Sequence, residues 1–323
     1  MLFMGAKVSV IIVNWNGKKF LGDCISSIFG QTYSNYEAIL VDNGSTDGSS
    51  DFARTTFPRL KIIALDQNYG FAKGNNIGMK EAMKDESLTY ILLLNVDTRL
   101  DPRFIEELVA VAESNDQIGA CQPRMLNMMD TSLIDAAGIT LDKSGNAIQL
   151  GYHEKDGEQF KQAKEVFGVN AGAALYRRSM LDKIGLFDED FFIYFEDVDL
   201  AIRARLDGWK SVYVPGAVVY HNHSHAFGKD SPVKAYLIER NRYYYIAKTL
   251  PRGILLKFLL MKPASMVKLC LYLIIRKKDA GMALVYTRAT IDGLKRLPQM
   301  LIKRRGIRKG KQVEDQAFKQ WLI

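Results

Sequence analysis

The chain contains 323 residues, of which 48% are hydrophobic, and it carries a net charge of +8. This length and apolar content allow a large core and exclude an intrinsically disordered chain. The charge is uneven, because residues 231–323 contain 21 Lys or Arg against 5 Asp or Glu and carry +16, which leaves −8 on the rest. We therefore expect the two parts to face different partners.

Short apolar runs rich in β-branched residues alternate with helix-like segments in the first third of the chain. The predicted strands are Val8–Val13, Ala38–Val41, Lys61–Ala64 and Tyr90–Leu94, and the predicted helices are Lys18–Phe29, Asp47–Phe57, Phe71–Met83 and Pro102–Ala112. This alternation predicts an α/β fold with a mainly parallel central sheet flanked by helices. The first apolar run is too short for the core of a signal peptide, so a buried first strand is expected.

Polar side chains stand at the ends of three of these strands. Asn14 follows the first strand, Asp42 follows the second, and Asn95 and Asp97 follow the run that ends at Leu94. In open parallel sheets, ligands bind outside the carboxyl ends of the strands. Polar groups from three strands at one edge therefore predict a shared binding site.

Two loops between these elements have features of a nucleotide site. In segment 39–49 (ILVDNGSTDGS), Asp42 can accept a hydrogen bond from the N3–H of uracil or thymine, and the amides of the next helix favour anions. An Asx-type turn is the alternative. In segment 68–78 (NYGFAKGNNIG), Gly70 lets the backbone approach a phosphate and Lys73 can add charge, whereas helix packing is the alternative use of the glycines. The spacing matches neither GxGxxG nor a Walker loop, so sites of those types are unsupported.

The segment 92–98 (LLLNVDT) predicts a metal site directly after a buried strand. A hard divalent cation such as Mg²⁺ or Mn²⁺ takes oxygen ligands from carboxylates, substrate phosphates and water. Asp97 can supply the carboxylate, whereas Asn95 can offer only a neutral oxygen. A helix cap is the alternative role for Asp97.

The segment 191–200 (FFIYFEDVDL) places Glu196 and Asp197 beneath aromatic residues. Burial and neighbouring charge raise the pKa of a carboxylate, and such a group suits a general base for a hydroxyl nucleophile. The spacing does not choose between Glu196 and Asp197. Asp199, four residues before Arg203, predicts an ion pair along a helix.

Three histidines alternate near the end of this part of the chain, at positions 221, 223 and 225. On a strand they would share one face. A zinc site is weakly supported, because no cysteine or further ligand cluster stands nearby. A single metal or phosphate contact by His221, or no catalytic role, remains open. The runs Val212–Val214 and Val218–Tyr220 predict two short strands before them.

The apolar stretch 254–275 is interrupted by Lys257, Lys262, Pro263 and Lys268 and is followed by basic residues. These interruptions argue against a simple membrane span. They favour a pair of interfacial helices on an anionic membrane surface, with the lysines reaching toward the head groups. A buried helical hairpin with a solvated basic face, or nucleic-acid binding, is the alternative.

We expect a domain boundary near residue 230, which divides 1–230 from the basic, helical region 231–323. The three cysteines, Cys24, Cys121 and Cys270, lie far apart and form no CxxC pair. Buried or idle thiols in a reducing compartment are therefore expected.

Five segments, in this order, resemble glycosyltransferase family 2 and, within it, the bacterial rhamnosyltransferase-like branch. They are VSVIIVNWN, VDNGSTDGS, NYGFAKGNNIG, LLLNVDT and GLFDEDFFIYFEDVDLAIRARLDG. The resemblance runs from about Lys7 to Phe227. It implies an A-type glycosyltransferase, Rossmann-like fold, a nucleoside-diphosphate sugar donor, a Mg²⁺ or Mn²⁺ ion, and inversion at the anomeric carbon.

The resemblance also implies roles for single residues. Binding of the nucleotide sugar is expected of Val13, Asn14, Asp42, Gly70, Lys73, Asn75 and Asn95, metal binding of Asp97 and His221, and catalysis of Asp197 as the base with Glu196 beside it. Asp97 would be the remaining carboxylate of the DxD motif of the family, because Asn95 stands where many members have Asp.

The implied reaction moves a hexose, with rhamnose as a candidate, from a dTDP- or UDP-linked donor to an acceptor hydroxyl. The expected acceptor is a lipid-linked glycan of cell-surface polysaccharide synthesis, at the cytoplasmic face of the membrane. Transfer to a polyprenyl phosphate and a non-catalytic nucleotide- or glycan-binding relative are the alternatives, with a nucleotidyltransferase less favoured. No nucleic-acid partner is expected, and a homo-oligomer is left open.

Overall fold

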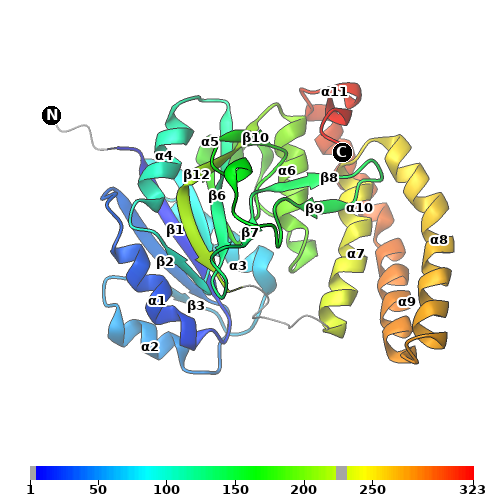
Figure 1. Ribbon diagram of the computed structural model, residues 1–323, viewed down its shortest axis with the longest axis horizontal. Coiled ribbons are helices and arrows are strands. Elements are labelled where there is room, and N and C mark those ends of the chain that lie inside the picture. The colour runs from blue at the N-terminus through cyan, green and yellow to red at the C-terminus, as the bar shows by residue number, and fades with distance from the viewer. Residues whose placement is uncertain (1–4, 223–230) are drawn as a thin grey trace.

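The computed structural model describes residues 5–222 and 231–323 (Figure 1). Its first elements are β1 (Lys7–Asn14), α1 (Lys18–Phe29), β2 (Tyr36–Asp42), α2 (Ser49–Thr56), β3 (Lys61–Ala64), α3 (Gly70–Ala82), β4 (Leu88–Asn95), β5 (Thr98–Leu100) and α4 (Phe104–Glu113). Next come β6 (Ile118–Asn127), β7 (Ile134–Ala136), β8 (Ile139–Leu141), β9 (Ala147–Gln149), β10 (Lys164–Val166), β11 (Ala173–Arg177), α5 (Arg178–Ile184), α6 (Glu196–Leu206) and β12 (Lys210–His221), with short 3₁₀ helices η1 (Glu158–Phe160) and η2 (Glu189–Phe191). The C-terminal helices are α7 (Pro232–Thr249), α8 (Arg252–Ile275), α9 (Ala280–Lys295), α10 (Leu297–Gly310) and α11 (Asp315–Lys319).

The central sheet has the strand order β10-β12-β6-β11-β4-β1-β2-β3, and outside this order β5 pairs with β12 and β7 pairs with β6. The strands β1 to β4 pair only in parallel with one another, as the sequence predicts. Beyond β4 the sheet is mixed, because β11 runs antiparallel to both β4 and β6. The predicted α/β fold with helices on both faces of the sheet is confirmed (Figure 1).

The strand β1 shows why these residues form a central strand. Successive side chains of a strand point to opposite faces. Val10 and Ile12 pack in the cluster that contains Ile25 of α1, and Ile11 packs on the other face with Met79 of α3. Both faces of β1 are thus covered, which explains its nearly continuous apolar sequence.

The last strand differs from the prediction of two short strands. β12 is a single strand that pairs in parallel with β6, and its register shifts between Val214 and Val218. Pro215 has no backbone N–H to donate, and Gly216 follows it, so the interruption is a bulge within one strand. His221 is the last residue of this continuous strand.

The C-terminal helices pack beside the sheet domain and share a core with it. α9 contacts α7, and α8 contacts α9, so that these helices run side by side (Figure 1). Ile246 of α7 and Met300 of α10 belong to one apolar cluster with Ile202 of α6, and Leu322 bridges to Leu141 of β8. The helix α7 is thus packed against the sheet domain. The division near residue 230 into two domains remains a prediction.

The helix α8 continues through Pro263 and is long and apolar enough to cross a membrane by length and composition. Only 6% of its most apolar window is buried, so it is not a core helix. One expected detail is wrong: Lys262 does not reach outward. Its ammonium lies 2.7 Å from Glu239 of α7, and its side chain is 12% exposed, because this face of α8 packs inward. Lys257 and Lys268 are exposed as expected.

Candidate functional site

A cavity of about 440 Å³ opens at the carboxyl ends of β1 and β4. Seven of the predicted site residues line it, and they come from five separate parts of the chain. They are Val13, Gly70, Asn95, Asp97, Glu196, Asp197 and His221. The fold therefore brings together carboxylates that lie about a hundred residues apart in the sequence.

Glu196 and Asp197 reach the cavity from the first turn of α6. The Oδ1 of Asp197 accepts a hydrogen bond from the N–H of Val198 at 2.8 Å, and its Oδ2 accepts one from Ala171 at 3.3 Å. Glu196 is 4% exposed, and its Oε2 has no hydrogen-bond partner among the described residues. Asp197 is thus held in place by backbone donors, whereas Glu196 is more deeply buried.

The two carboxyl groups titrate abnormally. Burial, together with the charge of Asp197, raises the pKa of Glu196 well above its usual value. Burial also raises the pKa of Asp197, although the backbone hydrogen bonds counteract this rise. Burial and the charge of Asp197 thus favour the protonated form of Glu196, whereas the backbone donors to Asp197 favour its anion.

Asp97 and His221 lie side by side in the lining of the cavity. The His221 Nε2 lies 3.4 Å from the Oδ1 of Asp97 and 3.2 Å from the Nδ2 of Asn95. The other ring nitrogen, Nδ1, lies 2.7 Å from the Oδ2 of Asp135 on β7. Burial alone would lower the pKa of His221, but the hydrogen bonds to Asp135 and Asp97 raise it to about 10.

This arrangement fits a divalent cation. A histidine that binds a metal through one nitrogen usually donates its other N–H to a carboxylate, which is the position of Asp135. A cation beside Asp97 could replace the proton that His221 otherwise holds. Within residues 5–222 and 231–323, no three His, Cys, Asp or Glu side chains form a group able to hold a metal ion alone. A bound ion would therefore need oxygen ligands from the substrate or water. His223 and His225 lie outside the described residues.

Asn14 and Asp42 lie next to the cavity but do not line it. The Nδ2 of Asn14 donates to Asp42 at 3.2 Å and to the hydroxyl of Ser45 at 3.0 Å, and its Oδ1 accepts from the N–H of Gly17. Both side chains are buried. These bonds join the loops after β1 and β2 to each other. Direct contact of Asn14 or Asp42 with a nucleotide remains a prediction.

The glycine-rich segment serves mainly for close packing. A Cβ on Gly70 would lie 2.6 Å from the carbonyl oxygen of Phe192, and the N–H of Ala72 donates to that oxygen. A Cβ on Gly78 would lie 2.4 Å from the side chain of Ile11. Gly70 lines the cavity and also receives the loop before α6, while Gly78 lets α3 approach the sheet.

Lys73 and Asn75 are not among the residues that line the cavity. The Lys73 ammonium lies 4.0 Å from the ring centre of Tyr69. The Nδ2 of Asn75 donates to the carbonyl of Phe71 one turn earlier at 2.9 Å, so its amide is directed along α3. Their contact with a donor remains a prediction.

Several cavity residues were not expected from the sequence. Trp15 lines the cavity directly after Asn14, and Asn43 lines it directly after Asp42. Asn43 fixes the start of α3, because its amide donates to Asn68 and Gly70 and accepts from Tyr69. Both stand beside predicted residues, so proximity in sequence was the available signal. No sequence signal pointed to Asp135, because it lies 86 residues before His221, which it contacts.

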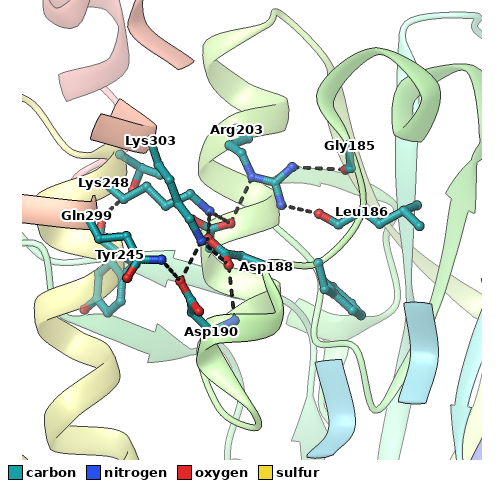
Figure 2. A network of polar contacts seen from close by, with 12 residues as sticks. Gly185, Leu186, Asp188, Asp190, Arg203, Tyr245, Lys248, Gln299 and Lys303 are labelled. Atoms are coloured by element: carbon teal, nitrogen blue, oxygen red, sulfur yellow. Dashed lines mark hydrogen bonds and ion pairs between the residues drawn. The ribbon is translucent and has the colours of Figure 1, made fainter. Parts of the chain in front are cut away.

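The C-terminal helices are bonded to the segment that leads to α6. Figure 2 shows Lys248 of α7 and Lys303 of α10 directed toward Asp188, with Asp190 beside them. Lys248 also lies 2.8 Å from Asp199, which pairs with Arg203 at 2.9 Å as predicted. These ion pairs connect α7 and α10 to both ends of residues 188–199, the acidic segment.

Comparison with known proteins gives a consistent result. A family model described as glycosyl transferase family 2 matches residues 9–185. An N-acetylglucosaminyl-diphospho-decaprenol L-rhamnosyltransferase of Mycobacterium tuberculosis is 28% identical over 259 residues, which cover 74% of this chain and 83% of that protein. The mannosyltransferase PcManGT of Pyrobaculum calidifontis, solved with GDP-Man and Mn²⁺, aligns with a TM-score of 0.53 at 15% identity over 95% of this chain and 86% of its own. GalNAc-T7, solved with UDP, GalNAc and Mn²⁺, aligns with a TM-score of 0.60 at 17% identity over 75% of this chain, which spans 48% of that chain.

Proposed function

Because the chain belongs to glycosyltransferase family 2 and is a nucleotide-sugar glycosyltransferase, we propose that it transfers rhamnose to a lipid-linked glycan with inversion at the anomeric carbon. The donor is a dTDP- or UDP-linked sugar, and the acceptor is a hydroxyl of a polyprenyl-diphosphate-linked saccharide. The cavity in which Asp97 and Asp197 meet is the observation that carries this proposal.

Asp197 is the base in this proposal. Its carboxylate takes the proton of the acceptor hydroxyl while that oxygen attacks the sugar carbon from the side opposite the leaving diphosphate. The backbone N–H groups of Ala171 and Val198 orient the carboxylate before the reaction begins. Glu196 keeps its proton and so does not repel the anionic form of Asp197.

The diphosphate lies near Asp97 and His221 in this proposal. These two residues would hold a Mg²⁺ or Mn²⁺ ion with Asn95 alongside, and the ion would neutralise charge on the leaving diphosphate. Asp135 keeps the His221 ring in place through its Nδ1. Trp15 and Val13 form an apolar part of the cavity lining, on which the nucleobase of the donor can pack.

The outer face of α8 is the proposed membrane contact. Exposed apolar side chains recur along one side of the helix, spanning roughly 60° of its circumference at about 100° per residue. They are Leu256, Leu260, Val267, Leu271 and Ile274, each at least 49% exposed. Lys257 and Lys268 lie at the edge of this stripe, and Arg276, Lys277 and Lys278 follow it, so the surface suits an anionic membrane.

The three cysteines are free thiols, which is consistent with a cytoplasmic location at the inner face of the membrane. Cys24 and Cys121 are buried, and burial raises the pKa of each to about 12, so neither is a reactive thiolate.

The test combines the purified enzyme, dTDP- and UDP-linked sugars, Mn²⁺ and a synthetic polyprenyl-diphosphate saccharide, with products identified by mass spectrometry. Asp197→Asn is expected to lower turnover about 10²–10⁴-fold, because it removes the base without changing the shape of the side chain. Asp182→Asn, which alters an exposed carboxylate on α5, is the matched control. Polyprenyl phosphate is offered as the acceptor in a parallel reaction. An extended saccharide supports the proposal, while a polyprenyl-phosphate-linked sugar formed in the parallel reaction, without extension of the saccharide, would contradict it. Turnover by Asp197→Asn within about threefold of the unmodified enzyme would also contradict it.

A further inference from the structure

The segment that leads into α6 has an unusual backbone. Phe192, Tyr194 and Phe195 have φ values of 65°, 74° and 69°, in the left-handed region that bulky residues rarely occupy. Glu196 follows at once, and Asp197 is the next residue. Such a backbone persists only where surrounding groups hold it in place.

A single buried side chain of α7 makes three of the hydrogen bonds that hold this segment. The Nδ2 of Asn241 lies 2.9 Å from the carbonyl oxygen of Phe191, 2.9 Å from that of Ile193 and 2.8 Å from that of Tyr194. Asn241 is completely buried. Its amide has two N–H groups, so one of them is shared between two of these three carbonyls, which lie within four residues of one another.

Arg240 supports the same contact from the neighbouring position. Its Nε donates to the Oδ1 of Asn241 at 2.9 Å, which fixes the orientation of the amide. Its Nη2 donates to the carbonyl of Phe191 at 3.0 Å and to that of Asp190 at 3.3 Å. On the opposite side, the N–H of Ala72 in α3 donates to the carbonyl of Phe192 at 3.0 Å. The segment is thus held between α3 and α7.

We propose that Asn241, supported by Arg240, is a positioning residue for the transfer reaction: it holds residues 191–195 in the backbone conformation, with positive φ at residues 192, 194 and 195, that directs Asp197 into the cavity. This inference rests on the proposed role of Asp197 as the base. It assigns part of the active-site machinery to the C-terminal region, because α7 lies beyond residues 9–185, which the family model matches. Neither Asn241 nor Arg240 is among the residues that line the cavity.

The positioning role predicts a loss of rate without a loss of donor binding. The donor side of the cavity, which includes Val13, Asn43 and Asp97, is built on β1, β2 and the loop after β4, whereas the side chain of Asn241 bonds to residues 191, 193 and 194 and to Arg240. Release of the segment therefore alters the position of the base and leaves donor binding intact. A small displacement of a catalytic group costs about 10²-fold in rate.

The experiment measures steady-state kinetics and Mn²⁺-dependent UDP binding by calorimetry for Asn241→Leu, which keeps the size of the side chain and removes its donors. We expect kcat to fall by about 10²-fold, while KM for the donor and the affinity for UDP change by less than about threefold. Arg240→Met, a milder change at a half-buried site, is expected to lower kcat by about tenfold with the same unchanged KM. Thr249→Val is the control, because Thr249 is equally buried on α7 and its hydroxyl bonds only within that helix, to Tyr245.

The outcomes separate the two proposals. If Asp197→Asn is inactive but Asn241→Leu and Arg240→Met keep their kcat, the positioning role is wrong and the proposed base stands. If Asp197→Asn is active, the proposed function fails instead. An equal loss in Thr249→Val, or a rise in KM with unchanged kcat, also overturns the positioning role. Should Asn241→Leu not fold, judged by circular dichroism, Arg240→Met decides the question.

Discussion

Lys248 is the centre of the buried ion network that joins α7 to the acidic segment, so its replacement tests whether that network stabilises the fold (Figure 2). Its ammonium lies 2.7 Å from Asp188 and 2.8 Å from Asp199, and the three side chains are 5%, 10% and 0% exposed. Burial alone would raise the pKa of Asp188, but Lys248 and Lys303 lower it to about 2. Lys248→Met removes the shared cation and keeps the aliphatic chain.

The expected loss of unfolding free energy depends on the ion pairs that remain in Lys248→Met. Breaking a buried ion pair costs about 3–5 kcal/mol, because an uncompensated charge is left inside the protein. Here each carboxylate keeps another cation, Arg203 for Asp199 and Lys303 for Asp188, so we expect about 2–4 kcal/mol. The unfolding entropy of about 2.1 cal/mol/K per residue makes each kcal/mol equal to roughly 1.5 °C in a chain of 323 residues. The melting temperature should therefore fall by about 3–6 °C.

Thermal unfolding followed by circular dichroism at pH 7 measures this change. Lys309→Met, which replaces an exposed lysine of α10, is the matched control and should shift the melting temperature by less than about 1 °C. The difference should persist in 1 M salt, because buried pairs are little screened. A melting temperature for Lys248→Met that equals that of the control would refute the claim that this network stabilises the fold.

Three further predictions concern the site and the membrane face. Glu196→Gln should raise the melting temperature at pH 8. Burial raises the pKa of Glu196, so the unmodified protein loses stability as the pH rises through that pKa, and the gain should shrink toward pH 5; an equal gain at both pH values would contradict this. Asp135→Asn should weaken Mn²⁺ binding about 10–100-fold by calorimetry, because His221 loses the carboxylate that orients it, and an unchanged affinity would argue against His221 as a ligand. Leu260→Glu should reduce flotation with vesicles of anionic phospholipid while Met129→Glu, at an exposed position on the sheet domain, should not; equal flotation of both variants would exclude α8 as the contact.

The strands and helices of the first hundred residues were predictable because their patterns are local. The helix Lys18–Phe29 has the predicted bounds, and β1 differs by one residue at each end. Asp97 and Asp197 were predictable as residues of a shared site, since each follows a recognisable segment. Asp97 lies at the sheet edge that the alternation of strands and helices implies, whereas Asp197 reaches the cavity from α6.

The contacts that complete the site were not predictable, because they depend on residues far apart in sequence. Asp135 lies in a three-residue strand without a distinctive pattern, and its role is visible only beside His221. Asn241 stands in a helix whose sequence gives no sign of its target, because the three carbonyls it binds become neighbours only in the folded backbone. The left-handed residues 192, 194 and 195 are aromatic, whereas glycine is the usual sign of such a conformation.

These contacts explain part of the uneven charge of the chain. The excess of +16 in residues 231–323 suggested a separate partner for that region. Part of this charge instead neutralises the acidic segment of the same chain, because Lys248 and Lys303 pair with Asp188, Asp190 and Asp199. Without those cations Asp188, Asp190 and Asp199 would lose ion-pair partners close to Glu196, whose pKa the charge of Asp199 already raises. The basic C-terminal helices therefore offset negative charge beside Asp197, the proposed base, while other basic residues of this region, among them the exposed Lys257 and Lys268 of α8, are available for the proposed membrane contact.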